Sequence, residues 1–221
     1  TSESVEPMEQ ISTAEAALYR VSEGASVGNE AVTFRTSSLT AIQQIEKALN
    51  SGGHISGLTT GLDDLNHKIG GLHDSDLIIL AGRPAMGKTS LATNIAFNCA
   101  ERYLRDMKDG IAPEKSVGAP TAFFSLEMSA DQLVHRMICS QAEVESEKIK
   151  TGSLDGEEFQ RIVGCINEMQ QHVMIIDDQP GLKITDLRAR ARRMKESYNI
   201  GFLVIDYLQL ISGSGTRNSQ E

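Results

Sequence analysis

The sequence has few of the features that mark membrane or secreted proteins. No stretch approaches the run of about 18 apolar residues that a transmembrane helix needs. The first ten residues are polar and hold no basic segment followed by an apolar one, so they do not resemble a secretory signal. We therefore expect a cytoplasmic protein with no membrane partner.

Cysteine is scarce as well. The three cysteines, Cys99, Cys139 and Cys165, are odd in number, far apart and each within a helical pattern. This arrangement argues against a disulfide framework or a C-x-x-C pair, and it favours three buried thiols in a reducing compartment. The five histidines show no metal-ligand spacing with these cysteines or with one another, so we predict no zinc site.

Positive charge is also in short supply. The chain holds 21 Lys and Arg against 30 Asp and Glu, which gives a net charge of −9. Because Lys and Arg neutralise nucleic-acid phosphates, this balance argues against a surface that coats itself with nucleic acid, although not against a local basic channel. Any contacts with DNA should be few and focused, as in a pore lined by several subunits.

The 221 residues, 40% of them hydrophobic, suffice for one α/β domain with an appendage. Two amphipathic helices are predicted ahead of it, each with an apolar stripe that its own domain or a neighbouring subunit must bury. An entry loop follows, and strands then alternate with helices, which indicates a mainly parallel sheet with helices on both faces. The predicted elements are helices at 11–23 and 36–50, the loop at 54–74, strands at 76–81, 121–125, 173–177 and 202–206, and helices at 88–104, 130–141, 157–169 and 186–198.

A phosphate-binding loop is the strongest motif. Residues 82–89 read GRPAMGKT and match G-x-x-x-x-G-K-[ST] at every fixed position, between a predicted strand and a predicted helix. The glycines let backbone N–H groups cradle phosphate oxygens, and the helix adds the positive end of its dipole. We predict that Lys88 reaches the β- and γ-phosphates of ATP and that Thr89 ligates Mg²⁺. The predicted cofactor-binding residues are Gly82, Arg83, Pro84, Ala85, Met86, Gly87, Lys88, Thr89 and Ser90.

Three predicted strands are followed by carboxylates that could serve this loop. Asp206 ends an apolar run and is the candidate for the second magnesium residue. Asp177 and Asp178 also end a strand, but the Gln-Pro-Gly turn after them favours turn or capping hydrogen bonds. Glu127 follows the strand at 121–125, and ligands of parallel α/β sheets sit at the carboxyl ends of strands. The residues alone leave two roles open for Glu127, the base of hydrolysis or an acid that starts the next helix.

The predicted helix at 186–198 is strongly basic. Such a run is typical of a solvated face, with a subunit-interface or DNA-facing patch as the alternative. The loop at 212–218 is flexible by composition and holds Arg217, so it either reaches toward DNA or is simply a loop. The basic residues of the helix are Arg188, Arg190, Arg192, Arg193 and Lys195.

Five motifs, taken in order, resemble those of DnaB-type replicative DNA helicases. They are TGLDDL at 60–65, GRPAMGKT at 82–89, SLEM at 125–128, LRARARR at 187–193 and DYLQLI at 206–211. The resemblance implies an α/β, RecA-like P-loop domain, preceded by the two amphipathic helices, that binds ATP and Mg²⁺ and hydrolyses ATP. It implies Glu127 as the catalytic base beside Lys88, and Asp206 with Thr89 as the residues of the magnesium site.

The resemblance also implies an organisation and a set of partners. Residues 1–30 would end an N-terminal helical region, 31–53 would form a linker helix that docks on the adjacent protomer, and 54–221 would form an ATPase domain that is incomplete at its C-terminus. The implied partners are single-stranded DNA, further copies of the chain in a homohexamer, a primase and a helicase loader.

The family's arginine finger, its main DNA-binding loop and one further strand would follow Glu221, so we assign no arginine of this chain as the finger. That strand would lie between the P-loop strand and the strand that ends at Asp206. Without it, two strand edges and an apolar strip would be exposed. We therefore expect the chain expressed alone to be poorly folded or weakly active.

Two other functions share the same nucleotide-binding core. One is a RecA-like or circadian-clock-like P-loop ATPase, and the other is a helicase loader that binds nucleotide and unwinds nothing. The SLEM and DYLQLI motifs favour the helicase over the first. Glu127 weighs against the second, because a pure nucleotide binder needs no base.

Overall fold

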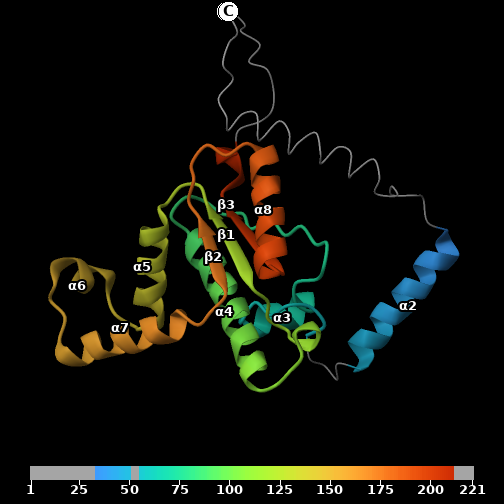
Figure 1. Cartoon of the computed structure of the whole chain (residues 1–221), viewed down its shortest axis with the longest axis horizontal. Coiled ribbons are helices and arrows are strands. Elements are labelled where there is room, and N and C mark those ends of the chain that lie inside the picture. Colours follow the sequence, from blue (N-terminus) through green and yellow to red (C-terminus); the bar gives the residue numbers. More distant parts are fainter. Residues whose placement is uncertain (1–32, 51–54, 212–221) are drawn as a thin grey trace, which may run out of the picture. The chain divides into compact units, whose positions relative to one another are not determined.

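The structure is a computed structural model that describes residues 33–50 and 55–211 (Figure 1). It separates into two units, one ending at Asn50 and the other beginning at Ser51, and each is described by itself. The predicted helix at 11–23 and the predicted loop at 212–218 lie outside the described residues. The three predicted domains, 1–30, 31–53 and 54–221, stay predictions.

The first unit contains helix α2, Phe34–Asn50, which begins two residues before the predicted start at residue 36. The Thr33 hydroxyl accepts a hydrogen bond from the backbone N–H of Thr36 (3.3 Å) and so caps the first turn. Leu39, Ile42 and Ile45 of the predicted apolar stripe are all exposed. The neighbour that buries this stripe stays a prediction.

The second unit is built on a parallel three-stranded sheet in the order β2-β1-β3. β1 (Thr121–Ser125) pairs on one side with β2 (Met174–Asp177) and on the other with β3 (Phe202–Asp206). All five residues of β1 are buried, as a central parallel strand covered on both faces requires. These three strands confirm the predicted parallel sheet.

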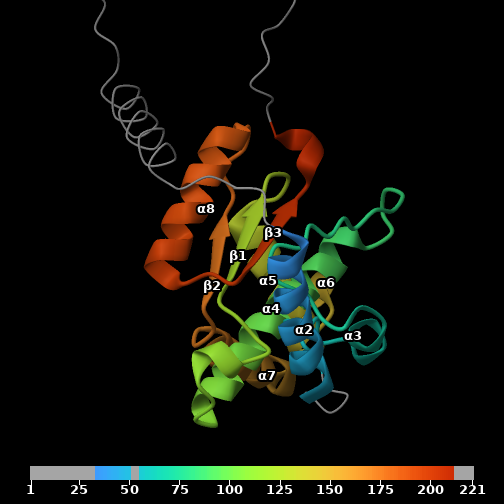
Figure 2. The same ribbon diagram turned by 90° about the vertical axis from the view of Figure 1, so that its right-hand side faces the viewer.

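Successive side chains of β1 enter different cores because they point to opposite faces of the sheet. Phe123 packs with Phe97 of α4 (Lys88–Lys108) and with Leu133 of α5 (Ala130–Gln141). Phe124 packs on the other face with Leu187 of α8 (Ile184–Tyr198). Figure 2 shows α8 on one side of the strands and α4 on the other, so helices cover both faces as predicted.

The remaining helices lie around this core. α7 (Gly156–Met169) begins with a capping box, in which Asp155 accepts from the Glu158 backbone N–H (2.7 Å) and Glu158 accepts from the Asp155 N–H (3.1 Å). Sequence patterns missed two short helices, α3 (Asp63–Ile69) within the predicted entry loop and α6 (Ser146–Thr151), and two 3₁₀ turns, Pro113–Lys115 and Leu208–Leu210. In the described part of the chain, no helix has both the length and the apolar character needed to cross a membrane.

A buried polar cluster holds α3 against α4. Asn66 Oδ1 accepts from the backbone N–H and the hydroxyl of Thr60 (2.9 and 2.7 Å), and Asn66 Nδ2 donates to the Thr59 hydroxyl (3.0 Å). Asn98 of α4 donates to the Thr60 carbonyl (3.2 Å). A Cβ at Gly61 (φ +74°) would lie 2.1 Å from Asn98 Nδ2, so only glycine fits there. The TGLDDL motif thus fastens the segment before the P-loop to the helix after it.

The prediction of a strand at 76–81 is wrong, because no strand forms there. Among the described residues, the sheet of the second unit contains β2, β1 and β3, and β3 pairs on one side only. Leu77, Ile78, Ile79 and Leu80 are exposed at 84%, 56%, 69% and 45%. Their composition suits a strand, but a strand also needs a neighbour for its backbone N–H and C=O groups. Nothing within residues 33–50 and 55–211 supplies that neighbour.

The prediction of three buried thiols is confirmed for one cysteine. Cys99 is buried in α4, and burial raises the pKa of its thiol to about 11. Cys139 and Cys165 are half-buried on α5 and α7. The Cys139 Sγ lies 3.7 Å from the Nδ1 of His135, one helical turn earlier.

The exposed apolar run at 77–80 should make the isolated chain self-associate, since its side chains form a contiguous strip and its backbone has no strand partner in the part of the chain that the structure describes. Replacing Leu77 and Ile79 with Asn should lower light scattering and the fluorescence of the dye ANS at equal protein concentration. Phe159 and Val163, exposed apolar residues of α7, provide a control pair whose replacement should change little. Equal scattering by the two double variants would contradict this account.

Candidate nucleotide-binding site

The loop from Gly82 to Ser90 turns sharply into α4. Ala85 and Gly87 both have left-handed backbone conformations, with φ of +61° and +78°. Gly87 is the N-cap of α4, and the first turn of this helix has neither a side-chain cap nor an acidic residue. The first backbone N–H groups of α4 are therefore free of an intrahelical or capping partner, which is the state in which a helix start binds anions.

Lys88 lies across the loop that precedes it. Its Nζ donates to the carbonyl oxygens of Gly82 (2.9 Å) and Arg83 (3.2 Å). A pocket of about 550 Å³ adjoins the loop, and its lining includes Met86, Lys88 and Leu91. Lys88, which we predict to bind phosphate, is thus one of the residues that form the wall of this pocket.

Thr89 and Asp206, 117 positions apart, meet directly. The Thr89 hydroxyl donates to Asp206 Oδ2 at 2.7 Å, and the Asp206 residue is only 9% exposed. Asp206 is the last residue of β3 and pairs in register with Ser125, the last residue of β1. The ladder continues one step further, where the Leu126 N–H donates to the Asp206 carbonyl (2.8 Å). The start of α4 and the ends of two strands therefore converge.

Glu127 lies two residues beyond the end of β1, in the short loop that leads to α5. The Ser125 hydroxyl donates to the Met128 carbonyl (2.7 Å) and closes this loop. Ser129 then caps α5 by accepting from the Gln132 N–H (3.3 Å). The Glu127 residue is exposed, so its carboxylate is open to solvent at the same edge of the sheet as Asp206.

Asp177 and Asp178 have the turn and capping roles that the sequence favours for them. Asp177 Oδ2 accepts from Arg190 Nη1 at 2.8 Å, and its Oδ1 accepts from the Gln179 N–H at 3.1 Å. Asp178 Oδ2 accepts from the Ala130 N–H at 2.7 Å. β2 lies on the side of β1 away from β3, so this pair is separated from Asp206 by the central strand.

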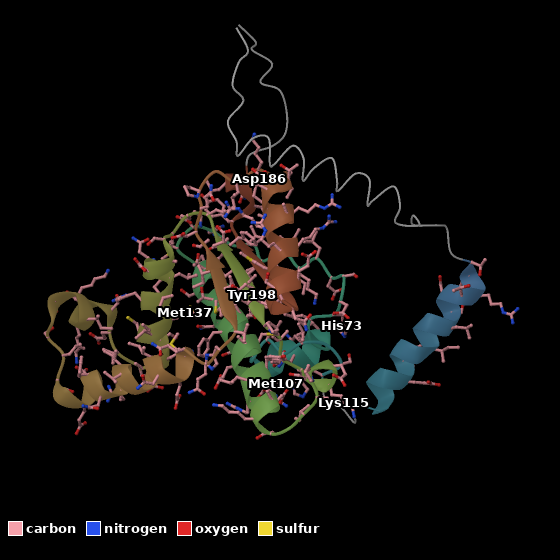
Figure 3. All side chains as sticks on the ribbon, in the orientation of Figure 1. His73, Met107, Lys115, Met137, Asp186 and Tyr198 are labelled. Carbon is pink, nitrogen blue, oxygen red and sulfur yellow. The ribbon has the colours of Figure 1, made fainter. Side chains whose placement is uncertain are left out.

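The basic helix α8 is not a uniformly solvated face. Figure 3 labels Asp186 in its first turn and Tyr198 at its end. Between them, Arg190 is paired with Asp177 against the sheet, and Lys195 donates to Asn199 (3.1 Å). The helical pattern of the sequence put Arg190 on the outer surface, and it could not show this pairing because Asp177 belongs to β2. Tyr198, which the same pattern predicted to face inward, is 50% exposed.

The residues at this edge fit a nucleotide with Mg²⁺. Magnesium prefers oxygen ligands and is held by few protein groups, with phosphates and water completing its octahedron. Thr89 and Asp206 supply a hydroxyl and a carboxylate in direct contact, beside uncapped N–H groups that suit phosphate. No cluster of three or more His, Cys, Asp or Glu that could hold a metal exists within residues 33–50 and 55–211. A shared site of this kind fits better than a cage built by the protein alone.

Fold and site together define a P-loop domain of the RecA-like class. Two solved structures share the fold. One is described as an ATPase domain (TM-score 0.68, 24% identity, covering 86% of this chain and 62% of that one), and the other is a DnaB-like replicative helicase studied with its primase interactions (TM-score 0.69, 23% identity, covering 93% and 46%). Residues 57–221 match the family described as DnaB-like helicase C terminal domain. The chain belongs to this family.

Individual relatives point to the same family. The chain is similar to the replicative DNA helicase DnaB of Rickettsia conorii, with 44% identity over 213 residues, covering 95% of this chain and 42% of that protein. It is also similar to the replicative DNA helicase DnaB of Geobacillus stearothermophilus, with 39% identity over 171 residues, covering 77% of this chain and 35% of the relative. The chain thus spans well under half the length of both relatives.

Gly87→Ala should weaken nucleotide binding, because an L-residue in the left-handed region costs about 1–2 kcal/mol and the loop would shift to relieve it. Titration with a fluorescent ATP analogue would show the loss of affinity, and thermal melting would show the loss of stability. Gly164→Ala is the matched control: this exposed glycine lies inside α7 with open space around it, so alanine there should stabilise by roughly 0.5–1 kcal/mol. Unchanged nucleotide affinity in Gly87→Ala would show that the loop backbone is not the binding element.

Proposed function

We propose that the chain is the ATP-hydrolysing motor domain of a replicative DNA helicase. It binds ATP with Mg²⁺ and couples hydrolysis to translocation along single-stranded DNA and to duplex unwinding. The single observation that carries the ATP-binding part of this proposal is the 2.7 Å contact between Thr89 and Asp206, which joins the P-loop to the end of β3. It supports a magnesium site at these two residues. The helicase part is supported by the family to which the chain belongs.

In this proposal the residues of the loop bind different parts of the nucleotide. The backbone N–H groups between Gly82 and Ser90 donate to phosphate oxygens, and Lys88 exchanges its two carbonyl acceptors for the β- and γ-phosphates. Thr89 and Asp206 would hold Mg²⁺ together with its water. Bound there, the ion would neutralise charge on the phosphates.

Glu127 is proposed as the base that accepts a proton from the attacking water. Its loop is closed by the Ser125 hydroxyl and starts beside Asp206 in the strand ladder, so its backbone has a fixed origin next to the magnesium residues. The Glu127 residue is exposed, so an attacking water could reach it.

The proposed partners follow from the family. The relatives named as replicative DNA helicases support single-stranded DNA as the track, and the structure studied with its primase interactions supports a primase partner. We further propose a homohexamer, with α2 (Phe34–Asn50) docked on the next protomer, and a helicase loader. The exposed apolar stripe of α2 supports its docking on the next protomer. The net charge of −9 supports few, focused DNA contacts.

Lys88→Ala should abolish hydrolysis and weaken ATP binding, since it removes a cation that the loop amides cannot replace. Titration of a fluorescent ATP analogue and steady-state ATPase, both in the whole protein that carries this chain, measure the two effects. Lys68→Ala, at an exposed lysine of α3, should leave both unchanged. Normal turnover by Lys88→Ala would rule out this loop as the site.

Glu127→Gln should instead spare binding and slow hydrolysis by about 10²–10⁴-fold, because glutamine keeps the size and loses the basicity. Affinity and turnover are measured in one preparation, with and without single-stranded DNA, together with unwinding of a forked duplex. Glu157→Gln on α7 serves as the control. An equal loss of binding and turnover would make Glu127 a structural residue, and ATPase without DNA stimulation or unwinding would contradict the helicase.

A further inference from the structure

The loop that carries Glu127 is anchored at both ends by hydrogen bonds. At its start, Ser125 pairs with Asp206 and its hydroxyl donates to the Met128 carbonyl. At its end, Ala130 begins α5 three residues after Glu127. The Glu127 side chain itself is exposed, so the position of its carboxylate follows from that of the backbone.

The second anchor comes from a distant part of the chain. Asp178, 48 positions from Ala130, accepts the Ala130 N–H at 2.7 Å, whereas the local cap Ser129 accepts the Gln132 N–H at 3.3 Å. A carboxylate at a helix start also interacts favourably with the helix dipole. The start of α5 is thus fixed to the end of β2 by the stronger of its two caps.

Asp178 is in turn held by its neighbours. Asp177 is 10% exposed at its side chain and pairs with Arg190 of α8, and the Arg190 guanidinium also donates to the Gln179 side chain. The Gln179 N–H donates back to Asp177. One arginine of α8 therefore fixes the turn on both sides of Asp178.

We infer that Asp178 is a positioning residue for Glu127. Its carboxylate ties the catalytic loop to β2 through the Ala130 N–H, and Arg190 keeps that carboxylate in place. The inference rests on the proposed role of Glu127 as base. A displacement of about 1 Å at a reacting group can cost on the order of 10²-fold in rate, so loss of this anchor should affect turnover more than binding.

The test uses Asp178→Ala in the whole protein. We expect kcat to fall by about tenfold or more, while the affinity for an ATP analogue changes less than about twofold. Asp178→Asn should recover most of kcat, because the carboxamide oxygen still accepts the Ala130 N–H. In a Glu127→Gln background, Asp178→Ala should cause no further loss, since no base is left to misplace.

A second variant breaks the same hydrogen bond from its other side. Ala130→Pro removes the donor at a position where helices accept proline, and Ser129 (φ −66°, ψ 155°) already has the conformation that precedes proline. It should lower kcat as Asp178→Ala does, and it keeps the test open if that variant fails to fold. Asp155→Ala is the matched control: it removes the cap of α7 and should lower the melting temperature without lowering kcat.

The outcomes separate the two proposals. Normal kcat in both Asp178→Ala and Ala130→Pro, with the turnover of Glu127→Gln still strongly reduced, would overturn the positioning role alone. Losses that multiply in the Glu127→Gln double variant would also overturn it, because the effect would then be structural. Normal turnover in Glu127→Gln itself would overturn the proposed base.

Discussion

The hydrogen-bond ladder between β1 and β3 is the constraint on which the site depends. It sets Ser125 opposite Asp206, and one residue further the Leu126 N–H still donates to the Asp206 carbonyl. The register therefore decides how far each strand projects toward the loop. A shift of β3 by one residue would turn Asp206 to the other face, away from Thr89, and would exchange Val204 and Ile205 between the two cores. The two aromatic cores on opposite faces oppose such a shift.

Local patterns in the sequence predicted much of this arrangement. Apolar runs that end in acid marked β1, β2 and β3, and the glycine and lysine spacing marked the P-loop. The same kind of pattern failed at 76–81, because apolar composition reports the tendency of a segment to pair and says nothing of its partner. Helix α2 and residues 77–80 illustrate this. The sequence predicts that each segment has an apolar surface, but it does not predict which surface would bury it.

Polar contacts between distant residues were the least predictable part. Asn98 and Thr60 are 38 positions apart, and Asp178 and Ala130 are 48 apart. Each pair joins a side chain to a backbone group, and any of many side chains could satisfy such a group. Their importance follows from burial or from the helix end that they occupy, and both depend on the completed fold. These contacts fasten the P-loop helix on one side and the Glu127 loop on the other.

The conformation of the Lys88 side chain has a consequence for which ligands the loop would select. Its ammonium closes a small ring with the Gly82 and Arg83 carbonyls, so the loop keeps its curl through its own charge. In the proposed function, ligand entry would be an exchange of acceptors, in which the number of hydrogen bonds is nearly conserved. Charged acceptors form bonds roughly twice as strong as neutral ones, so a ligand rich in anionic oxygens would displace the carbonyls more readily than a neutral ligand. The oxygen atoms of a nucleoside or a sugar are neutral acceptors, no stronger than the two carbonyls that they would have to displace. The loop would therefore discriminate against such ligands without any contact to the nucleobase.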